Sequence, residues 1–241
     1  MEQNLDLGQH FMIDEDLISY IVSKADISEE DTILEIGSGE GILSKKILEN
    51  SPNKLICVEI DERLNKIEGA EYIQGNILKK LNILKFNKII SNIPYHISEP
   101  LFSKLSIIKT DLIVCTVGNS FADKLLDESI IGNILRSVYD ITKDKIIGPE
   151  VFDPSPKVDS ALIILKLKLQ SPSDKILSKF HLHGASKIKN FLIKSSEEFF
   201  SKKELRAKLI KMDLDLQEKD LYSLSTKDFL LMRDFIYNEL F

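Results

Sequence analysis

Short apolar runs alternate with amphipathic stretches along most of the chain, from Thr32 to about Lys168. Runs rich in Ile, Val and Leu predict strands, and apolar residues spaced three and four apart predict the helices between them. Because strands and helices alternate, the pattern predicts an α/β fold with an open, mostly parallel, doubly wound sheet. The predicted strands are Thr32–Ile36, Lys54–Glu59, Glu71–Gln74, Lys88–Ser91, Asp111–Val117, Lys145–Ile147 and Ser160–Leu169, and the predicted helices are Ile42–Leu48, Glu62–Ile67, Pro100–Ile107 and Phe121–Leu126.

The character of the chain changes after Gln170. Strict alternation of apolar residues with Lys166 and Lys168 predicts that the last strand is an antiparallel strand at the edge of the sheet. A linker-like stretch follows it, and then a lysine-rich region in which Ser201 and Ser225 each begin a helix-capping pattern. We therefore predict two domains, residues 1–170 and a small helical domain of residues 171–241.

Composition narrows the class of protein. Apolar residues make up 43% and charged residues 29% of the 241 residues, which predicts a folded core rather than disorder. The apolar runs are too short to span a membrane, and the first residues show no signal-peptide pattern, so we expect a cytoplasmic protein without a membrane partner. Cys57 and Cys115 lie in apolar runs and are expected to be core residues, and no His/Cys spacing predicts a metal site.

Charge is distributed unevenly over the chain. The net charge is -6, yet residues 1–149 carry 16 basic and 24 acidic side chains, whereas residues 157–211 carry 13 basic and 5 acidic ones. A basic segment in an acidic protein is either a solvated surface or a contact region for phosphates. Charge alone favours the solvated surface.

A glycine-rich turn follows the first predicted strand, in the segment Glu35–Gly41. Glycines there allow a tight turn close to a ligand, and Glu59, at the end of the next strand, is placed to accept hydrogen bonds from ribose hydroxyls. The spacing G-x-G-x-G differs from the dinucleotide pattern G-x-G-x-x-G, which favours S-adenosylmethionine over a nicotinamide dinucleotide. Asn76, after the third strand, would face the adenine of that cofactor.

The fourth predicted strand ends in the segment Asn92-Ile93-Pro94-Tyr95. A tetrapeptide of this type is found where exocyclic amines of nucleic acids are methylated. The Asn92 side-chain oxygen and the Pro94 carbonyl could accept the two N–H groups of an adenine amine, and Tyr95 could stack on a flipped-out base. The alternative interpretation is that this segment is an ordinary turn. Its position after the fourth strand favours a catalytic role instead.

Together these motifs resemble the KsgA-type rRNA adenine dimethyltransferases, and the resemblance covers nearly the whole chain. The opening motif Gly8–Asp14, the glycine turn, the Asn-Ile-Pro-Tyr segment, the segment Pro149–Ser160 and the tail segment Leu221–Ser225 all match that family. The resemblance implies a Rossmann-like class I methyltransferase domain over 1–170 and a domain over 171–241 that contacts RNA or the ribosome. It further implies a monomer that uses S-adenosylmethionine to dimethylate adenine N6 in small-subunit rRNA, within the pre-ribosomal small subunit, as part of ribosome biogenesis.

The resemblance also assigns roles to particular residues. Tyr95 and Phe152 would stack on the two faces of the target adenine, beside the acceptors Asn92 and Pro94, and Gln9 would help to hold the methionine part of the cofactor. The remaining cofactor site would be formed by His10, Met12, Gly37, Gly39, Glu59, Ile60, Asn76 and Asn92.

Two departures from the family pattern keep alternatives open. Asn76 stands where the family has Asp, and Gly118–Ser120 replace the usual Gln-Lys-Glu. An erythromycin-resistance type enzyme acting on large-subunit RNA shares the Asn-Ile-Pro-Tyr core. A family member that serves mainly as a non-catalytic ribosome-assembly factor is the third reading.

Overall fold

The computed structural model describes residues 9–183 and 186–241, so Gly8 of the opening motif lies outside the described residues. The chain forms two compact units. The first contains the described residues up to Leu101, with Thr110–Asp123 and Asp140–Leu167, and the second contains Phe102–Lys109, Lys124–Tyr139 and the described residues from Lys168 onward. The two units therefore divide the chain at several points, and the functional division at Gln170 stays a prediction. No helix in the described part of the chain is long and apolar enough to cross a membrane.

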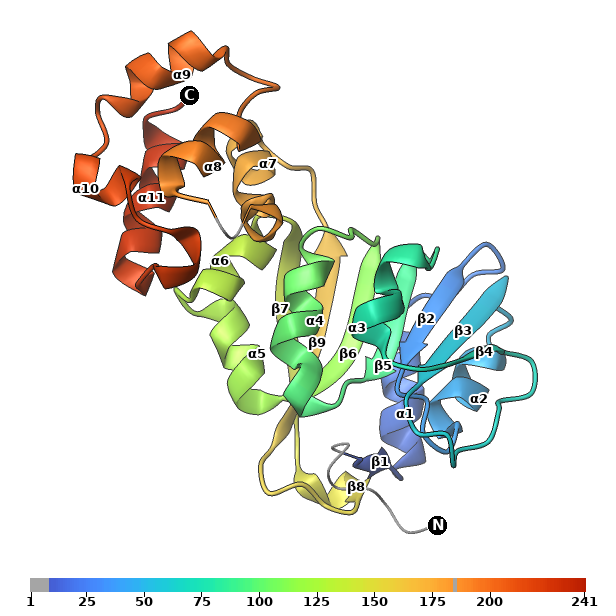
Figure 1. Ribbon diagram of the computed structural model, residues 1–241. Helices are drawn as coiled ribbons and strands as arrows, with labels where there is room; N and C mark the ends of the chain where they lie inside the picture. The colour runs from blue at the N-terminus through green and yellow to red at the C-terminus, as the bar shows by residue number, and fades with distance from the viewer. Residues whose placement is uncertain (1–8, 184–185) are drawn as a thin grey trace. The chain divides into compact units, whose positions relative to one another are not determined.

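A seven-stranded sheet forms the centre of the first unit, in the order β4-β3-β2-β5-β6-β9-β7 (Figure 1). The pairs β2–β3, β3–β4, β2–β5 and β5–β6 are parallel, and β6–β9 is antiparallel. The predicted α/β class and mostly parallel sheet are thus confirmed. The strands are β2 (Thr32–Ile36), β3 (Lys54–Glu59), β4 (Glu71–Gln74), β5 (Lys88–Asn92), β6 (Leu112–Gly118), β7 (Tyr139–Ile147) and β9 (Ser160–Leu167), and a separate antiparallel pair joins β1 (Phe11–Met12) to β8 (Phe152–Asp153).

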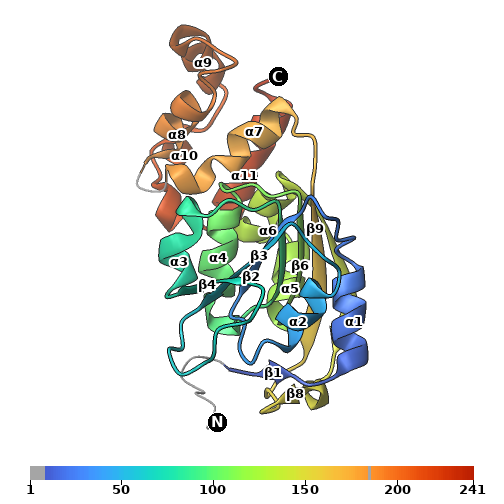
Figure 2. The ribbon, with the colours of Figure 1, turned by 90° about the vertical axis from the view of Figure 1, so that its right-hand side faces the viewer.

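Helices cover both faces of this sheet. Figure 2 shows α1 and α2 on one side of the strands and α3 and α4 on the other. Apolar side chains of α1 and α2, among them Leu17, Ile21 and Ile47, join the buried core of the first unit, which agrees with the helical spacing of their sequences. The helices of the chain are α1 (Glu15–Ser23), α2 (Ile42–Leu48), α3 (Ile77–Lys80), α4 (Ser98–Leu105), α5 (Asn119–Leu126), α6 (Ile130–Arg136), α7 (Pro172–Ser178), α8 (Ile188–Ser195), α9 (Lys202–Leu209), α10 (Leu214–Gln217) and α11 (Thr226–Asn238).

Two predictions of local structure are wrong. The segment Glu62–Ile67 forms a turn followed by irregular structure instead of a helix, because Asp61 accepts bonds from the backbone and side chain of Arg63 and thereby fixes the turn at its start. The strand β9 is antiparallel as predicted, but it lies between β6 and β7 and not at the edge. It is buried on both faces from Ser160 to Leu165, so its alternation of apolar and polar residues does not mark an exposed face.

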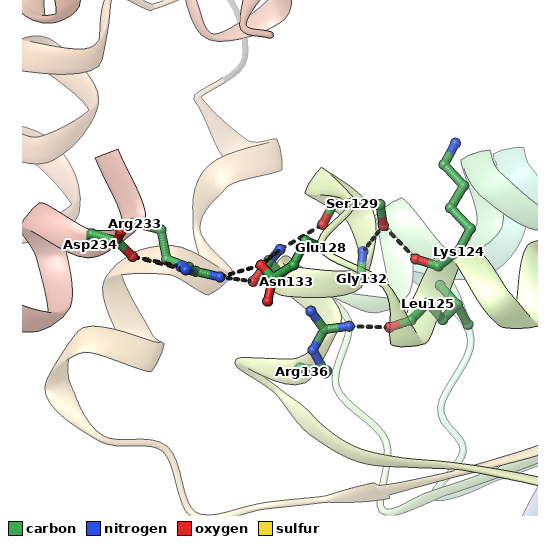
Figure 3. Close-up of polar contacts among 9 residues, drawn as sticks. All are labelled: Lys124, Leu125, Glu128, Ser129, Gly132, Asn133, Arg136, Arg233 and Asp234. Carbon is green, nitrogen blue, oxygen red and sulfur yellow. Dashed lines mark hydrogen bonds and ion pairs between the residues drawn. The ribbon is translucent and has the colours of Figure 1, made fainter. Parts of the chain in front are cut away.

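The second unit has its own apolar core, formed by helices α6 to α11 and the turns between them. Ser201 begins α9 with a reciprocal capping box, as predicted, and Ser225 caps α11. Figure 3 shows how Arg233 of α11 is held: its Nη1 donates to Glu128 at 2.6 Å and to Asn133 at 2.7 Å. These contacts explain why the segment around α6, which precedes β7 in sequence, belongs to the helical unit.

Candidate active site

A pocket lies at the carboxyl ends of β2, β3 and β5. The order of the sheet reverses between β2 and β5, and ligands of doubly wound sheets bind at such a switch point. The pocket brings together ten of the twelve residues that the sequence analysis assigned to the site. Those ten are Gln9, His10, Gly37, Gly39, Glu59, Ile60, Asn76, Asn92, Pro94 and Tyr95.

The glycine-rich turn brings backbone close to the pocket. Gly39 and Gly41 have φ angles of 56° and 80°, in the left-handed region that favours glycine. A Cβ at Gly39 would lie 2.7 Å from the ring of Phe11, so only glycine fits between the turn and the N-terminal segment.

The carboxylate of Glu59 is buried and held by backbone donors. One oxygen accepts the N–H groups of Ile60 and Asp61 at 2.8 and 2.9 Å, and the other accepts the N–H of Gly39 at 3.0 Å. The second oxygen keeps an acceptor position within the pocket, which suits a ribose hydroxyl. The bond to Gly39 also ties the glycine turn to the end of β3.

Met12 lies beside the main pocket and not in it. It lines a smaller adjoining cavity together with Ser38, Gly39 and Asn92. The hydroxyl of Ser38 is buried there without a hydrogen-bond partner among the described residues. A buried polar atom without a partner is costly, so this hydroxyl points to a polar group supplied by a ligand. The two cavities share Asn92, which places it between them.

Asn76 begins the short helix α3. Its side-chain oxygen accepts the N–H of Leu78 at 2.8 Å, which leaves one further acceptor position and the amide NH2 group. The residue therefore reaches the pocket with fewer free acceptors than an aspartate would offer.

Asn92 is held on both sides of its amide. Its Nδ2 donates to the carbonyl of His10 at 2.9 Å, and its Oδ1 accepts from the hydroxyl of Thr116. The sequence analysis missed Thr116, because a single threonine within the apolar run Leu112–Val117 reads as a core residue. The register of β5 and β6 provides the signal, since Asn92 and Thr116 are direct partners.

Tyr95 and Pro94 present the groups expected of a base-binding segment. The Tyr95 hydroxyl is bonded to Ser160 at 2.5 Å, and its half-buried ring stacks on His10 with centroids 5.9 Å apart. The Pro94 carbonyl accepts the N–H of Ile97 at 3.1 Å and retains a second acceptor position. Asn92 Oδ1 and the Pro94 carbonyl can therefore each accept one further hydrogen bond from a ligand.

The N-terminal segment crosses the pocket and is fixed by polar contacts. Gln9 donates to Asp61 at 2.7 Å, so the contact it makes is with the end of β3. His10 Nδ1 lies 2.6 Å from the carbonyl of Pro154, and β1 pairs with β8. Arg63 and then Gln9, by their hydrogen bonds, hold the pKa of the Asp61 carboxyl below its usual value.

Phe152 is the one residue of the predicted base-binding group that is not among the pocket-lining residues. Its side chain is 2% exposed and belongs to the core of the first unit, where it pairs with Met12 across β1 and β8. It does not line the pocket, and its stacking on the target adenine stays a prediction. Burying an aromatic ring of this size in the core is favourable, which accounts for its position.

Glu35 is a buried acid beneath the glycine turn. It accepts a hydrogen bond from Ser44 at 2.5 Å, and burial raises its pKa from 4.5 to about 8. The folded protein therefore keeps this proton at pH 7, whereas the unfolded chain releases it above pH 4.5.

We predict that stability falls as pH rises from 4.5 to 8 on account of Glu35. The unfolded state binds fewer protons in that window, and the shift corresponds to roughly 4 to 5 kcal/mol in the free energy of unfolding. In Glu35→Gln this slope should be absent. Urea unfolding of both proteins at pH 5, 6, 7 and 8 measures the difference, and parallel pH profiles would contradict the assignment.

The fold is similar to those of two solved methyltransferases. A dimethyladenosine transferase from Plasmodium falciparum has a TM-score of 0.63 at 24% identity, covering 92% of this chain and 96% of that one. The 23S rRNA methyltransferase ErmE has a TM-score of 0.62 at 18% identity, covering 95% and 100%. At these identities the likeness concerns the fold.

Sequence comparison adds the family. The model of the family described as ribosomal RNA adenine dimethylase matches residues 1–182. A "Probable ribosomal RNA small subunit methyltransferase A" of Thermococcus gammatolerans is 30% identical over 95% of this chain and 88% of its own length. One of the same description from Methanosphaera stadtmanae is 31% identical over 90% and 88%. The chain therefore belongs to the ribosomal RNA adenine dimethylase family, whose members are S-adenosylmethionine-dependent methyltransferases.

Proposed function

We propose that this protein dimethylates N6 of an adenine in small-subunit rRNA, as a monomer acting on the pre-ribosomal small subunit in the cytoplasm. One observation carries the site of this reaction: the Asn92–Tyr95 segment and the Glu59 carboxylate line the same pocket. The relatives described as small subunit methyltransferases support the small-subunit substrate over the large-subunit alternative.

The pocket residues fit S-adenosylmethionine, which supplies an electrophilic methyl group on a positively charged sulfur. Glu59 would accept the ribose hydroxyls through the oxygen that also holds Gly39. The unpartnered Ser38 hydroxyl would bind the polar end of the methionine part, in the cavity that Met12 lines. Asn76 would face the adenine. Each proposed role uses a polar group at one of two cavities that share Asn92 among their lining residues.

The target amine would be held by two oxygens of the Asn92–Tyr95 segment. The lone pair of an adenine amine is delocalised into the ring, so the nitrogen is a poor nucleophile. Asn92 Oδ1 and the Pro94 carbonyl would each accept one N–H, which favours the pyramidal nitrogen that attack requires. Tyr95 would offer one face of its ring to the base. Once methylated, the nitrogen becomes acidic and loses its proton to solvent, so the reaction needs no general base.

The basic segment 157–211 is the candidate contact region for RNA phosphates. Several of its lysines already have ion-pair partners: Lys187 and Lys189 share Glu218, and Lys211 contacts Glu239. A second group of lysines, which includes Lys109 from outside this segment, has fewer ion-pair partners. Lys109, Lys175 and Lys179 line one surface pocket of the second unit, where only Lys179 has an ion-pair partner, Glu198, among the lining residues. Three ammonium groups and one carboxylate leave a net positive charge for an RNA phosphate.

We predict that this lysine pocket contributes to RNA binding. Burial, and then the charges of Lys175 and Lys179, hold the pKa of Lys109 below its usual value, and a phosphate would relieve that repulsion. Replacing Lys109 and Lys175 together by Gln should weaken binding to a small-subunit rRNA transcript and lower the salt slope by about 1 to 2. Fluorescence anisotropy over a range of salt concentrations measures both.

The matched control is the double replacement of Lys187 and Lys189 by Gln. Because these two lysines share Glu218, their loss should change the salt slope less. Equal slopes for the two double variants would show that the lysine pocket has no special part in RNA binding.

The proposed function itself is tested by methyl transfer from labelled S-adenosylmethionine to small and large ribosomal subunits in separate reactions. Label should enter the small subunit. Label in the large subunit would favour the erythromycin-resistance type of activity. No transfer to either, with intact RNA binding, would favour the non-catalytic assembly factor.

A further inference from the structure

The amide of Asn92 can be oriented in two ways, and its surroundings select one. The backbone carbonyl of His10 can only accept a hydrogen bond, so the NH2 end of the amide must face it, as it does at 2.9 Å. The oxygen end then faces Thr116 and the pocket. In the opposite orientation two oxygens would face each other, and the pocket would contain an NH2 group in place of an acceptor.

Thr116 provides the second half of this arrangement. Its hydroxyl is fully buried and donates to Asn92 Oδ1 from the neighbouring strand β6, at the position directly paired with Asn92. A carbonyl oxygen accepts two hydrogen bonds, so one position is occupied by Thr116 and the other is left for a ligand. The direction of this second acceptor position is set by the strand register, because β5 and β6 are neighbouring strands of the central sheet.

We propose that Thr116 is a positioning residue for methyl transfer: its hydroxyl fixes the direction in which Asn92 accepts the N–H of the target amine. This inference rests on the proposed function. Thr116 does not line the pocket, so it acts through Asn92 and not by contact with either substrate. Ser160 makes a parallel contact from β9 to the Tyr95 hydroxyl, which shows that buried hydroxyls of adjacent strands hold both ends of the Asn92–Tyr95 segment.

Single-turnover methylation by three variants tests this role. Thr116→Val keeps the shape and removes the donor, so the single-turnover rate should fall roughly 3- to 10-fold, the effect of losing one hydrogen bond. Thr116→Ser keeps the donor and should restore the rate to within about twofold. Thr116→Cys has a weak donor of similar size and should lie between them. The affinities for S-adenosylmethionine and for RNA, measured by calorimetry and anisotropy, should stay within about twofold of wild type, since Thr116 is buried and is not among the pocket-lining residues.

The control is Ser137→Ala, which also removes a buried hydroxyl bonded to one carbonyl, that of Ile134 in the second unit. It should methylate at the wild-type rate. If Thr116→Val methylates at the wild-type rate, or if Thr116→Ser is as slow as Thr116→Val, Thr116 does not position Asn92. Should Thr116→Val fail to fold, the rates of the other two variants test the proposal. Thr116→Ser should methylate faster than Thr116→Cys, and equal rates would contradict the role of Thr116. A wild-type protein that transfers no methyl group contradicts the proposed function instead.

Discussion

Replacing Asn92 by alanine is expected to lower the rate of methyl transfer by a factor of about 100 to 1,000, the usual effect of removing one preorganised polar contact to the reacting group. The oxygen that is lost is the one that Thr116 and the sheet register hold in place. The Pro94 carbonyl alone would leave one N–H of the amine without an acceptor. The nitrogen would then spend less time in the geometry needed for attack.

Single-turnover methylation of ribosomal subunits measures this effect, with binding of cofactor and RNA followed separately. Asn50→Ala is a matched control, because Asn50 is exposed and donates only to a carbonyl at the end of α2. Asn92→Ala should keep RNA affinity and lose turnover, while the control keeps both. Turnover near that of wild type in Asn92→Ala would leave the Asn92–Tyr95 segment without its proposed role.

Replacing Glu59 by alanine is expected to weaken S-adenosylmethionine binding by roughly 1.5 to 3 kcal/mol, the range for hydrogen bonds to a charged group. Its carboxylate accepts three backbone N–H groups, so part of the loss will come from loosening of the glycine turn at Gly39. Glu59→Gln keeps the size of the side chain and places an NH2 group where an acceptor stood, so it should also bind weakly.

Calorimetric titration with S-adenosylmethionine distinguishes these outcomes, and thermal unfolding reports any loosening of the fold. Glu62→Gln is the control, since this exposed residue lies three positions further along and is not among the pocket-lining residues. An affinity equal to that of wild type in both Glu59 variants would mean that the ribose binds elsewhere.

The sheet could be predicted because its strands are short apolar runs with few alternatives. Thr32–Ile36, Lys54–Glu59 and Glu71–Gln74 have the predicted bounds. The Glu62–Ile67 segment has helical spacing, yet the Asp61 side chain accepts bonds from the backbone and side chain of Arg63, which favours a turn there. The place of β9 depends on β7 covering its outer side, a contact between distant segments that alternation alone does not reveal.

The position of the site could be predicted because its motifs follow successive parallel strands, whose carboxyl ends lie at the same edge of the sheet. The structure brings Glu59, Asn76 and Asn92 to one pocket, while their roles stay predictions. Phe152 was assigned to the site because it lies in a segment that matches the family. Its burial in the core depends on the pairing of β1 with β8. Thr116 could not be recognised from the sequence, because only strand register shows that its hydroxyl meets Asn92.

The most direct measurement identifies the modified nucleoside itself. Small-subunit rRNA is incubated with the protein and S-adenosylmethionine, digested to nucleosides and examined by mass spectrometry, with Asn92→Ala in a parallel reaction. The acceptors Asn92 and Pro94 predict methylation of an adenine amine, and membership of the adenine dimethylase family predicts N6,N6-dimethyladenosine with the wild-type protein. Little or none is expected with the variant. Methyl groups on a cytosine, on ribose oxygens or on any atom other than an adenine amine would contradict it.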